Sequence, residues 1–361
     1  MYSKVQGRPC SRSSSLLMRR KRRFTCTAIV LATLAALAAL HQLLLLAYTY
    51  NDYILALLPK PHLPQQIRPV KPPSRSKAAL GGAEGGPRIL CLISTSPKYH
   101  ETRARHVAAT WSPHCTRAAF LTTLQDPALP EVVLTPGAAT YEQLWEKVMQ
   151  GFQWAYKSIG DFDWVVKADD DSFILLENLK AAVLGLDPDV PAAAGVHLRT
   201  WETGETYLNG GASYVLSRGA VRVLVEKGIT GGRCQKDLQL GIQEDVNIAA
   251  CLDLLGVVFL DSRDSEGRQR FHIYPPQELV DPRSETDLRH LWLKRISIYP
   301  YKFGYKELSD EVISFHYVDA ETMYLIYYLV YLVNPQADPL HHPRSPLHPR
   351  PPLQPLKDRT N

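Results

Sequence analysis

The stretch WVVKADDDSFILL, residues 164–176, sets three consecutive aspartates between two apolar runs. The apolar run 164–168 predicts a short buried strand. In open α/β sheets, ligands bind beyond the carboxyl ends of the strands, so carboxylates that directly follow this strand stand at a candidate site. Side chains alternate in direction along an extended chain. We therefore expect Asp169 and Asp171 to point the same way and Asp170 to face elsewhere.

The acidic triplet has two interpretations. Three adjacent carboxylates repel one another unless a cation offsets their charge, and oxygen ligands on a short turn suit Mg²⁺ or Mn²⁺, with substrate phosphates completing the coordination. The alternative is a solvated acidic turn or a helix N-cap, which for a bare triplet is the more common case. The apolar runs on both sides of the triplet favour a binding site.

Strand-like and helix-like segments alternate around this stretch. The patterns predict strands over 88–95, 118–124 and 257–260, and helices over 101–111 and 141–159. A further helix is expected to be capped by Ser217 and to end before Gly228, and another to run from Asp245 to Leu255. Such alternation predicts an α/β fold, with a mostly parallel sheet and helices on both faces.

Three other positions are candidates for chemistry. Glu244 and Asp245 open a predicted helix, where a carboxylate is ordinarily a cap; the functional interpretation is a general base that takes a proton from a hydroxyl. His316 lies in a predicted strand over 313–318, where a lone histidine is more often a core residue, although a neutral imidazole is also a nitrogen ligand that favours Mn²⁺ over Mg²⁺. Gly210 and Gly211 predict a tight turn that a ligand can approach closely.

The basic excess of the chain belongs to its N-terminal end. Residues 1–48 hold eight Lys and Arg and no Asp or Glu, whereas the rest of the chain holds 33 Lys and Arg against 36 Asp and Glu. Tracking a phosphate backbone needs cationic charge on the folded domain. The balance of the body therefore argues against nucleic acid as a partner.

The N-terminal end also predicts a membrane anchor. The basic cluster RRKRR, residues 19–23, precedes an uncharged apolar run over 24–48. About 20 apolar residues cross a bilayer, whereas the apolar core of a cleavable signal peptide has roughly 7–15. Basic residues before the span keep the N-terminus in the cytosol. We expect a cytosolic basic tail over 1–23 and a single-pass transmembrane anchor over 24–48; the alternative is a cleaved signal peptide.

The remainder divides into three parts. Residues 59–87 hold seven Pro and four Gly, so 49–87 is expected to be an extended stem, and 334–361 holds eight Pro and is expected to be a disordered tail. Residues 88–333 are expected to form one compact enzyme domain. It contains four cysteines that allow three pairings in an oxidising lumen, of which the nearest-neighbour pairs close the shortest loops: Cys91, Cys115, Cys234 and Cys251.

These segments together resemble a known family. The chain carries, in one order, the segments WVVKADDD (164–171), YLNGGASYVLS (207–217), EDV (244–246), DSRD (261–264) and SFHYVD (314–319). With the anchor and the stem before them, they resemble the core 1 β1,3-galactosyltransferase branch of the β1,3-glycosyltransferases. The resemblance covers roughly residues 88–333.

The resemblance implies a GT-A fold and a type II protein of the Golgi membrane with its catalytic domain in the lumen. It implies UDP-galactose as donor, Mn²⁺ as cofactor and GalNAc α-linked to Ser or Thr of a glycoprotein as acceptor, with direct displacement and inversion. A homodimer is compatible with it. The implied roles are: metal ligands Asp169, Asp171 and His316; nucleotide-sugar contacts Thr95, Lys147, Asp169 and Tyr317; base Asp245, with Glu244 as alternate; acceptor contacts Trp292, Gly210 and Gly211.

The chain departs from the family pattern in three places. Ala139-Thr140-Tyr141 stand where the family usually has Glu-Gly-Arg, Trp292 lacks the aromatic-rich stretch that usually follows it, and Glu307-Leu308 replace an adjacent cysteine pair. Two alternatives therefore stand beside galactosyl transfer: a non-catalytic, chaperone-like relative, and a β1,3-glycosyltransferase with another acceptor or donor. The retained acidic triplet argues against the chaperone.

Overall fold

The computed structural model describes residues 36–42, 86–200, 204–236, 242–287 and 290–333. By its internal contacts the chain divides into two units, residues 1–67 and 68–361. Of the expected anchor, only residues 36–42 are described, and they are helical. Among the described helices, none combines the length and the apolar character needed to span a bilayer. The expected cytosolic tail, the stem as far as residue 85 and the C-terminal tail lie outside the described residues.

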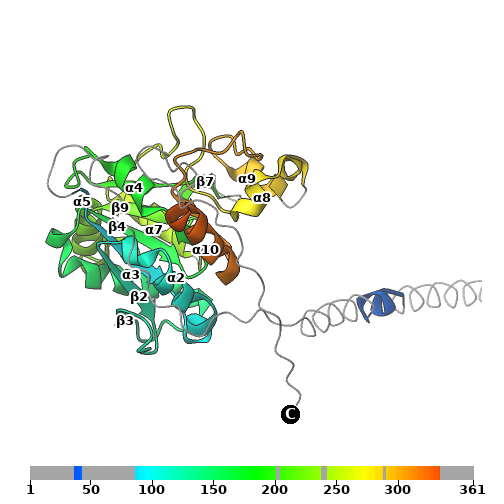
Figure 1. Cartoon of the computed structure of the whole chain (residues 1–361). Helices are drawn as coiled ribbons and strands as arrows, with labels where there is room; N and C mark the ends of the chain where they lie inside the picture. The colour runs from blue at the N-terminus through cyan, green and yellow to red at the C-terminus, as the bar shows by residue number, and fades with distance from the viewer. Residues whose placement is uncertain (1–35, 43–85, 201–203, 237–241, 288–289, 334–361) are drawn as a thin grey trace, which may run out of the picture. The chain divides into compact units, whose positions relative to one another are not determined.

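A mixed sheet forms the centre of the second unit (Figure 1). Its strands, in spatial order, are β10 (Val258–Phe259), β6 (Ala192–Gly195), β9 (Tyr214–Ser217), β4 (Trp164–Asp169), β1 (Ile89–Ser94), β2 (Arg117–Thr122) and β3 (Val132–Leu134). Neighbouring strands are parallel, except that β9 runs antiparallel to both β4 and β6. The expectation of a mostly parallel sheet is confirmed.

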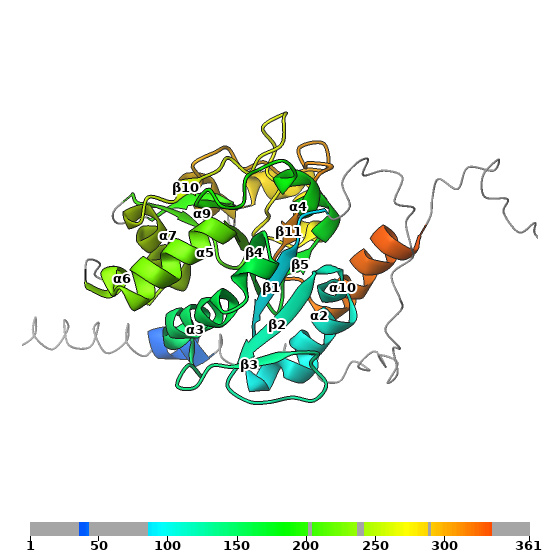
Figure 2. The same cartoon turned by 90° about the vertical axis from the view of Figure 1, so that its left-hand side faces the viewer.

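Helices cover both faces of the sheet (Figure 2). The side chains of β1 alternate between two cores: Ile89, Cys91 and Ile93 enter one, and Leu90 and Leu92 enter the other. The first core is covered by α2 (Arg105–Ala109), α4 (Leu176–Val183) and α10 (Ala320–Tyr327), and the second by α3 (Leu144–Tyr156), α5 (Arg218–Val223) and α7 (Glu244–Leu254). The α/β layering that the alternating segments predict is confirmed.

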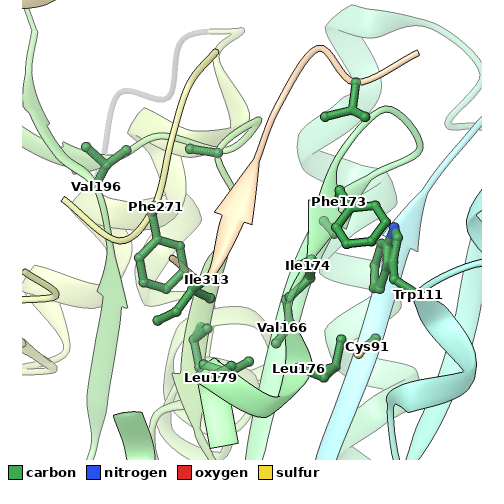
Figure 3. Packing of buried hydrophobic residues seen from close by; sticks show 14 of the residues in the cluster. Cys91, Trp111, Val166, Phe173, Ile174, Leu176, Leu179, Val196, Phe271 and Ile313 are labelled. Carbon is green, nitrogen blue, oxygen red and sulfur yellow. The ribbon is translucent and has the colours of Figure 1, made fainter. Parts of the chain in front are cut away.

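A second, two-stranded sheet brings distant segments of the chain together. After the acidic triplet, β5 (Phe173–Ile174) pairs antiparallel with β11 (Ser314–Phe315). Figure 3 shows Phe173 and Ile174 among the buried side chains, with the ring of Trp111 beside Phe173. The indole Nε1 of Trp111 donates a hydrogen bond to the carbonyl of Ser172 at 2.8 Å, which fixes the turn between β4 and β5.

The smaller elements lie at the edges of these layers. The strands β7 (His197–Arg199) and β8 (Thr206–Leu208) form an antiparallel pair. Three short helices are α6 (Arg233–Lys236), α8 (Pro276–Val280) and α9 (Leu291–Ile296). Regular pairing within the predicted strand 313–318 stops at Phe315, because Tyr317 has a left-handed backbone with φ of 54°. The predicted strands at 118–124 and 257–260 are each shorter than expected.

The helix after Ser217 extends further than expected. The hydroxyl of Ser217 accepts a hydrogen bond from the amide of Ala220, so the predicted cap is confirmed. However, the helix continues beyond α5 as a π-helical segment, Leu224–Thr230, which contains Gly228. The predicted end before Gly228 is wrong. A Cβ at Gly228 would lie 2.8 Å from the Cys234 sulfur, so the glycine instead permits close packing against the Cys234–Cys251 disulfide.

The disulfides join nearest neighbours in sequence. Cys91 of β1 is bonded to Cys115, and Cys234 is bonded to Cys251 of α7. These are the two pairings that close the shortest loops. The first lies in the core under α2, and the second ties α7 to the segment after the π-helical turn.

Substitution of Phe152 tests whether the core under α3 contributes strongly to the stability of the second unit. Its side chain is fully buried. Phe152→Ala is expected to lower the free energy of unfolding by about 3–5 kcal/mol, because it removes apolar contacts and leaves a cavity. Urea denaturation measures the change. As control, Leu184→Ala alters an exposed residue and should stay within about 0.5 kcal/mol of the parent. Equal effects of the two substitutions would contradict the assigned core.

Candidate active site

A cleft of about 910 Å³ opens at the carboxyl ends of β1 and β4. These strands are parallel, and Ser94 at the end of β1 pairs with Asp169 at the end of β4. The residues that follow the two strands therefore meet at one edge of the sheet. Ten of the eleven expected site residues line this cleft: Thr95, Lys147, Asp169, Asp171, Gly210, Gly211, Glu244, Asp245, His316 and Tyr317. The position of the cleft agrees with the general location of ligands in open α/β sheets.

The candidate metal ligands converge in space. Asp169, Asp171 and His316 each offer one ligand atom, and these atoms all lie within 4.8 Å of one another. His316 Nε2 is 3.3 Å from Asp171 Oδ1, and His316 Nδ1 is buried without a hydrogen-bond partner among the described residues. Two carboxylates and one imidazole are a donor set that fits Mn²⁺. The residues present therefore fit the expected ion.

Asp170 is not part of the candidate ligand group, which agrees with the expected alternation of side chains. Its Oδ2 accepts a hydrogen bond from the hydroxyl of Thr95 at 2.7 Å. Burial raises the pKa of Asp170 to about 7, and the Thr95 hydrogen bond only partly opposes that rise. The middle aspartate thus joins the ends of β1 and β4. This contact explains why a triplet supplies only two of the three candidate ligands.

The turn at Gly211 makes room for His316. A Cβ on Gly211 would lie 2.1 Å from His316 Cε1, a separation that no side chain could adopt without displacing the ring. On its other side, the ring of Tyr317 stacks on His316 with centroids 3.9 Å apart. The glycine expected to let a ligand approach the backbone therefore lets the imidazole approach it.

Glu244 and Asp245 stand at the start of α7 and face the same cleft. Glu244 is only 4% exposed, and it accepts a hydrogen bond of 2.6 Å from the hydroxyl of Tyr214. Burial raises the pKa of Glu244 to about 7, although Lys167 and Tyr214 act to lower it. Burial also raises the pKa of Asp245, whose Oδ2 accepts a hydrogen bond from the amide of Gly210 at 3.0 Å.

The capping interpretation of this pair is confirmed only in part, because Asp245 Oδ1 accepts a hydrogen bond from the first-turn amide of Val246 but neither carboxylate is at the N-cap. The residue at the N-cap of α7 is Gln243, which makes no side-chain capping bond. The carboxylate of Asp245 is instead held between the amides of Gly210 and Val246. A buried and a half-buried carboxyl group with raised pKa values, next to a candidate metal-ligand cluster in a cleft, are typical of acid–base chemistry.

Lys167 is a site residue that sequence reasoning missed. It is 1% exposed within β4, and its Nζ lies 2.8 Å from Asp169 Oδ1 and 3.5 Å from Glu244 Oε2. Burial alone would lower the pKa of Lys167, but the two carboxylates outweigh burial and hold the pKa above the ordinary lysine value. The sequence did contain a signal, a lysine inside an apolar strand. A lysine in a buried strand is almost always paired with a carboxylate, so its presence indicated an ion pair at this position.

Lys147 reaches the cleft from α3. Its Nζ donates a hydrogen bond of 2.6 Å to the carbonyl of Thr95, at the end of β1. Burial lowers the pKa of Lys147, and the nearby Asp170 and Asp169 partly offset this decrease. Thr95 and Lys147, predicted separately, therefore lie side by side at one end of the cleft.

Trp292 is the one expected site residue that does not line this cleft. It lies on α9, is 43% exposed, and donates a hydrogen bond from Nε1 to the hydroxyl of Tyr274 at 3.0 Å. A residue that lines the cleft but was not predicted is Arg103, which lies 2.8 Å from Asp171. Nothing in the periodicity of residues 101–111 distinguished Arg103 from the other basic residues of that segment.

Comparison with known proteins assigns these elements to a family. A Fringe-like family profile matches residues 86–272. Glycoprotein-N-acetylgalactosamine 3-beta-galactosyltransferase 1 of Xenopus laevis is 34% identical over 245 residues, which is 68% of this chain and 66% of that protein. The match thus spans just under two thirds of the relative's length. The resemblance to the core 1 galactosyltransferase branch is confirmed by this similarity.

Solved structures of glycosyltransferases are more distant. The galactosyltransferase LgtC, in complex with donor and acceptor sugar analogues, is 13% identical with a TM-score of 0.35; the match covers 68% of this chain and 98% of LgtC. The glycosyltransferase GlyE of Streptococcus pneumoniae TIGR4 is 11% identical with a TM-score of 0.35, over 65% of this chain and 55% of GlyE. Similarity at this level adds nothing to what the cleft itself shows.

Gly211→Ala tests whether the close approach of the glycine positions His316. The added methyl group would displace the imidazole, so we expect Mn²⁺ binding to weaken by at least about tenfold while the fold is retained. Titration of the protein with Mn²⁺, followed by electron paramagnetic resonance of the free ion, measures the affinity. Gly160→Ala is the matched control, because a Cβ there meets nothing within 4 Å. Unchanged Mn²⁺ affinity in Gly211→Ala would remove His316 from the ligand set.

Proposed function

The chain belongs to the Fringe-like family, and we propose that it is an inverting, Mn²⁺-dependent β1,3-galactosyltransferase. In this proposal it moves galactose from UDP-galactose to the 3-hydroxyl of GalNAc α-linked to Ser or Thr of glycoproteins. One observation carries the proposal: Asp169, Asp171 and His316 converge in the same cleft as the carboxyl pair Glu244 and Asp245. The name of the Xenopus relative supports the choice of donor sugar and acceptor.

Asp169, Asp171 and His316 would hold the metal ion, which when bound neutralises charge on the departing UDP. Lys167 holds the Asp169 carboxylate in position, because its ammonium lies 2.8 Å from Asp169 Oδ1. Thr95, Lys147 and Tyr317 would contact the nucleotide sugar; their position in the lining of the same cleft supports this part of the proposal. The protein thereby supplies a set of ligands and cations at the position that the diphosphate would occupy.

The carboxylate pair at the start of α7 would act as the base. Asp245, oriented by the amide of Gly210, takes the proton from the acceptor 3-hydroxyl, with Glu244 as the alternate. The hydroxyl oxygen forms a bond to C1 of galactose as the bond from C1 to the UDP oxygen breaks. The electron pair leaves with UDP, so one displacement at C1 inverts its configuration.

The same proposal extends to the whole chain. It takes residues 88–333 as a GT-A type domain in the Golgi lumen, and residues 24–48 as the anchor, with 1–23 cytosolic and 49–87 as a stem. The Cys91–Cys115 and Cys234–Cys251 disulfides support an oxidising compartment. Trp292 is kept as a candidate acceptor contact outside the main cleft, where it is partly exposed on α9.

Asp171→Asn tests the proposed transfer. With UDP-galactose, Mn²⁺ and an α-GalNAc peptide, the parent should form the β1,3-linked disaccharide, and removal of the metal with EDTA should abolish it. Asp171→Asn should lower the rate by more than about 100-fold, because it removes the charge of a metal ligand. Mass spectrometry of the peptide measures product. Asp310→Asn is the control, because it changes an exposed carboxylate that does not line the cleft, and it should retain full activity.

The outcome also separates the alternatives. If the parent binds UDP and Mn²⁺ but forms product only with another sugar acceptor or another donor, the reaction class stands and the proposed substrate is wrong. If a well-folded parent neither binds UDP nor releases it from UDP-galactose, the chaperone-like alternative is favoured and galactosyl transfer is excluded.

Tyr214→Phe tests whether ionisation of Glu244 controls the reaction. The tyrosine hydroxyl stabilises the ionised carboxylate, so its removal should raise the pKa of Glu244 above its value of about 7. The base must be ionised, so activity is lost as pH falls, and in Tyr214→Phe that loss should occur about 0.5–1 pH unit higher. The pH profile of kcat/KM measures it. Tyr301→Phe removes a buried hydroxyl outside the cleft lining and should leave the profile unchanged. A profile that does not move in Tyr214→Phe would leave Asp245 alone as the base.

A further inference from the structure

Arg103 is attached to the acidic triplet through a single nitrogen. It lies on the π-helical turn His100–Ala104, and its Nη1 is 2.8 Å from Asp171 Oδ2 and 3.4 Å from Asp170 Oδ1. The guanidinium thus reaches across the cleft to the end of β4. Two ion pairs to adjacent carboxylates hold this one corner of the guanidinium in place.

His316 of the candidate ligand set and Arg103 contact different oxygens of the Asp171 carboxylate. Asp171 Oδ1 faces His316 Nε2 at 3.3 Å, whereas Oδ2 faces Arg103. Arg103 therefore stands beside the three candidate ligands and does not occupy the position between them. A ligand that contacts the metal on this side would meet the arginine as its next neighbour.

Most of the hydrogen-bonding capacity of Arg103 is unused within the described part of the protein. A guanidinium carries five N–H donors, and the hydrogen bonds of Arg103 all use Nη1. The side chain is 38% exposed at the wall of the cleft, and its guanidinium lies over the ring of Tyr99 at 4.2 Å. The contact with Tyr99 restrains the guanidinium, and Nε and Nη2 make no hydrogen bond to the described residues.

The charges of the cleft leave Arg103 as a suitable cation for an anionic ligand. Six carboxyl groups line the cleft: Glu142, Asp169, Asp170, Asp171, Glu244 and Asp245. Lys147 and Lys167 are both buried, and both are hydrogen-bonded to groups of the protein. Lys98 also lines the cleft and is exposed, but its ammonium lies over the ring of Tyr99 at 4.5 Å and is a point charge without the planar fork of a guanidinium. Arg103 is partly exposed, permanently charged, and shaped for two parallel hydrogen bonds to phosphate oxygens.

We propose that Arg103 binds the diphosphate of the nucleotide-sugar donor through Nε and Nη2, while Nη1 remains on Asp170 and Asp171. The inference rests on the proposed function and adds a residue to it. When the bond between C1 of the sugar and the diphosphate oxygen breaks, the electron pair remains on the diphosphate, and the fixed guanidinium stabilises that charge. Arg103 would then be a catalytic residue that touches the leaving group.

The test compares nucleotides that differ in their phosphates. Affinities of UDP and UMP for the parent, Arg103→Gln and Arg103→Lys are measured by calorimetry at saturating Mn²⁺. Arg103→Gln should weaken UDP binding by about 10- to 100-fold and UMP binding by less, so that the preference for UDP over UMP falls. Arg103→Lys should lie between, because it keeps the charge but loses the planar fork.

Two controls distinguish this role from simple support of Asp171. Arg105→Gln removes an exposed arginine that pairs with Glu101 and does not line the cleft, and it should leave both affinities unchanged. Mn²⁺ binding without nucleotide should be unchanged or tighter in Arg103→Gln, because a neighbouring positive charge is removed. Weaker Mn²⁺ binding with an unaltered preference for UDP over UMP would overturn the proposal and make Arg103 a positioning residue. If the parent binds no UDP, the proposed function fails before Arg103 is tested.

Discussion

The antiparallel pairing of β5 with β11 is the constraint on which the site depends. It aligns Phe315 with Phe173 and Ser314 with Ile174, so His316 emerges beside Asp171. The amide of Val318 then bonds to the carbonyl of Asp171 at 2.8 Å, and the amide of Leu175 bonds to the carbonyl of Ile313 at 2.8 Å. Residues on both sides of the acidic turn are thereby fixed to the segment that carries the imidazole. Without that pairing, the aspartates would be an acidic turn at the end of a strand.

Buried charges impose a second constraint on the site. Lys167 and Glu244 are both nearly inaccessible to water, and burying a charge is unfavourable unless it is paired and hydrogen-bonded. Lys167 meets this condition by joining Asp169 of the candidate metal ligands to Glu244 of the candidate base. The two halves of the proposed chemistry are consequently one electrostatic unit. A substitution at any member leaves an uncompensated charge on the others, so effects on stability and on activity should be difficult to separate at these positions.

Local patterns predicted the scaffold better than they predicted the site. The apolar run before Asp169 and the periodicity of α3 were sufficient to place both elements, because burial of one face dictates residue spacing. Lys167 was missed although Asp169 is two residues away, because its other partner, Glu244, lies on a segment that only the fold brings near. The partners of Arg103 are likewise distant in the sequence. Gly228 lies inside the helix where it packs against a disulfide, and the left-handed Tyr317 ends a strand that sequence alone extends. Each of these differences arises from a tertiary contact.

The wall of the cleft is built from two kinds of structure, elements of the sheet layers and a local turn. The candidate ligands and base are held by β4, β11 and α7, whose positions are fixed by packing on both faces of the sheet. The turn with Ala139, Thr140 and Tyr141 also lines the cleft, and a capping box between Thr140 and Gln143 fixes its shape locally. Tyr141 is exposed there. The departures from the family pattern therefore lie on a locally fixed turn of the cleft wall and not among the candidate metal ligands or the candidate base.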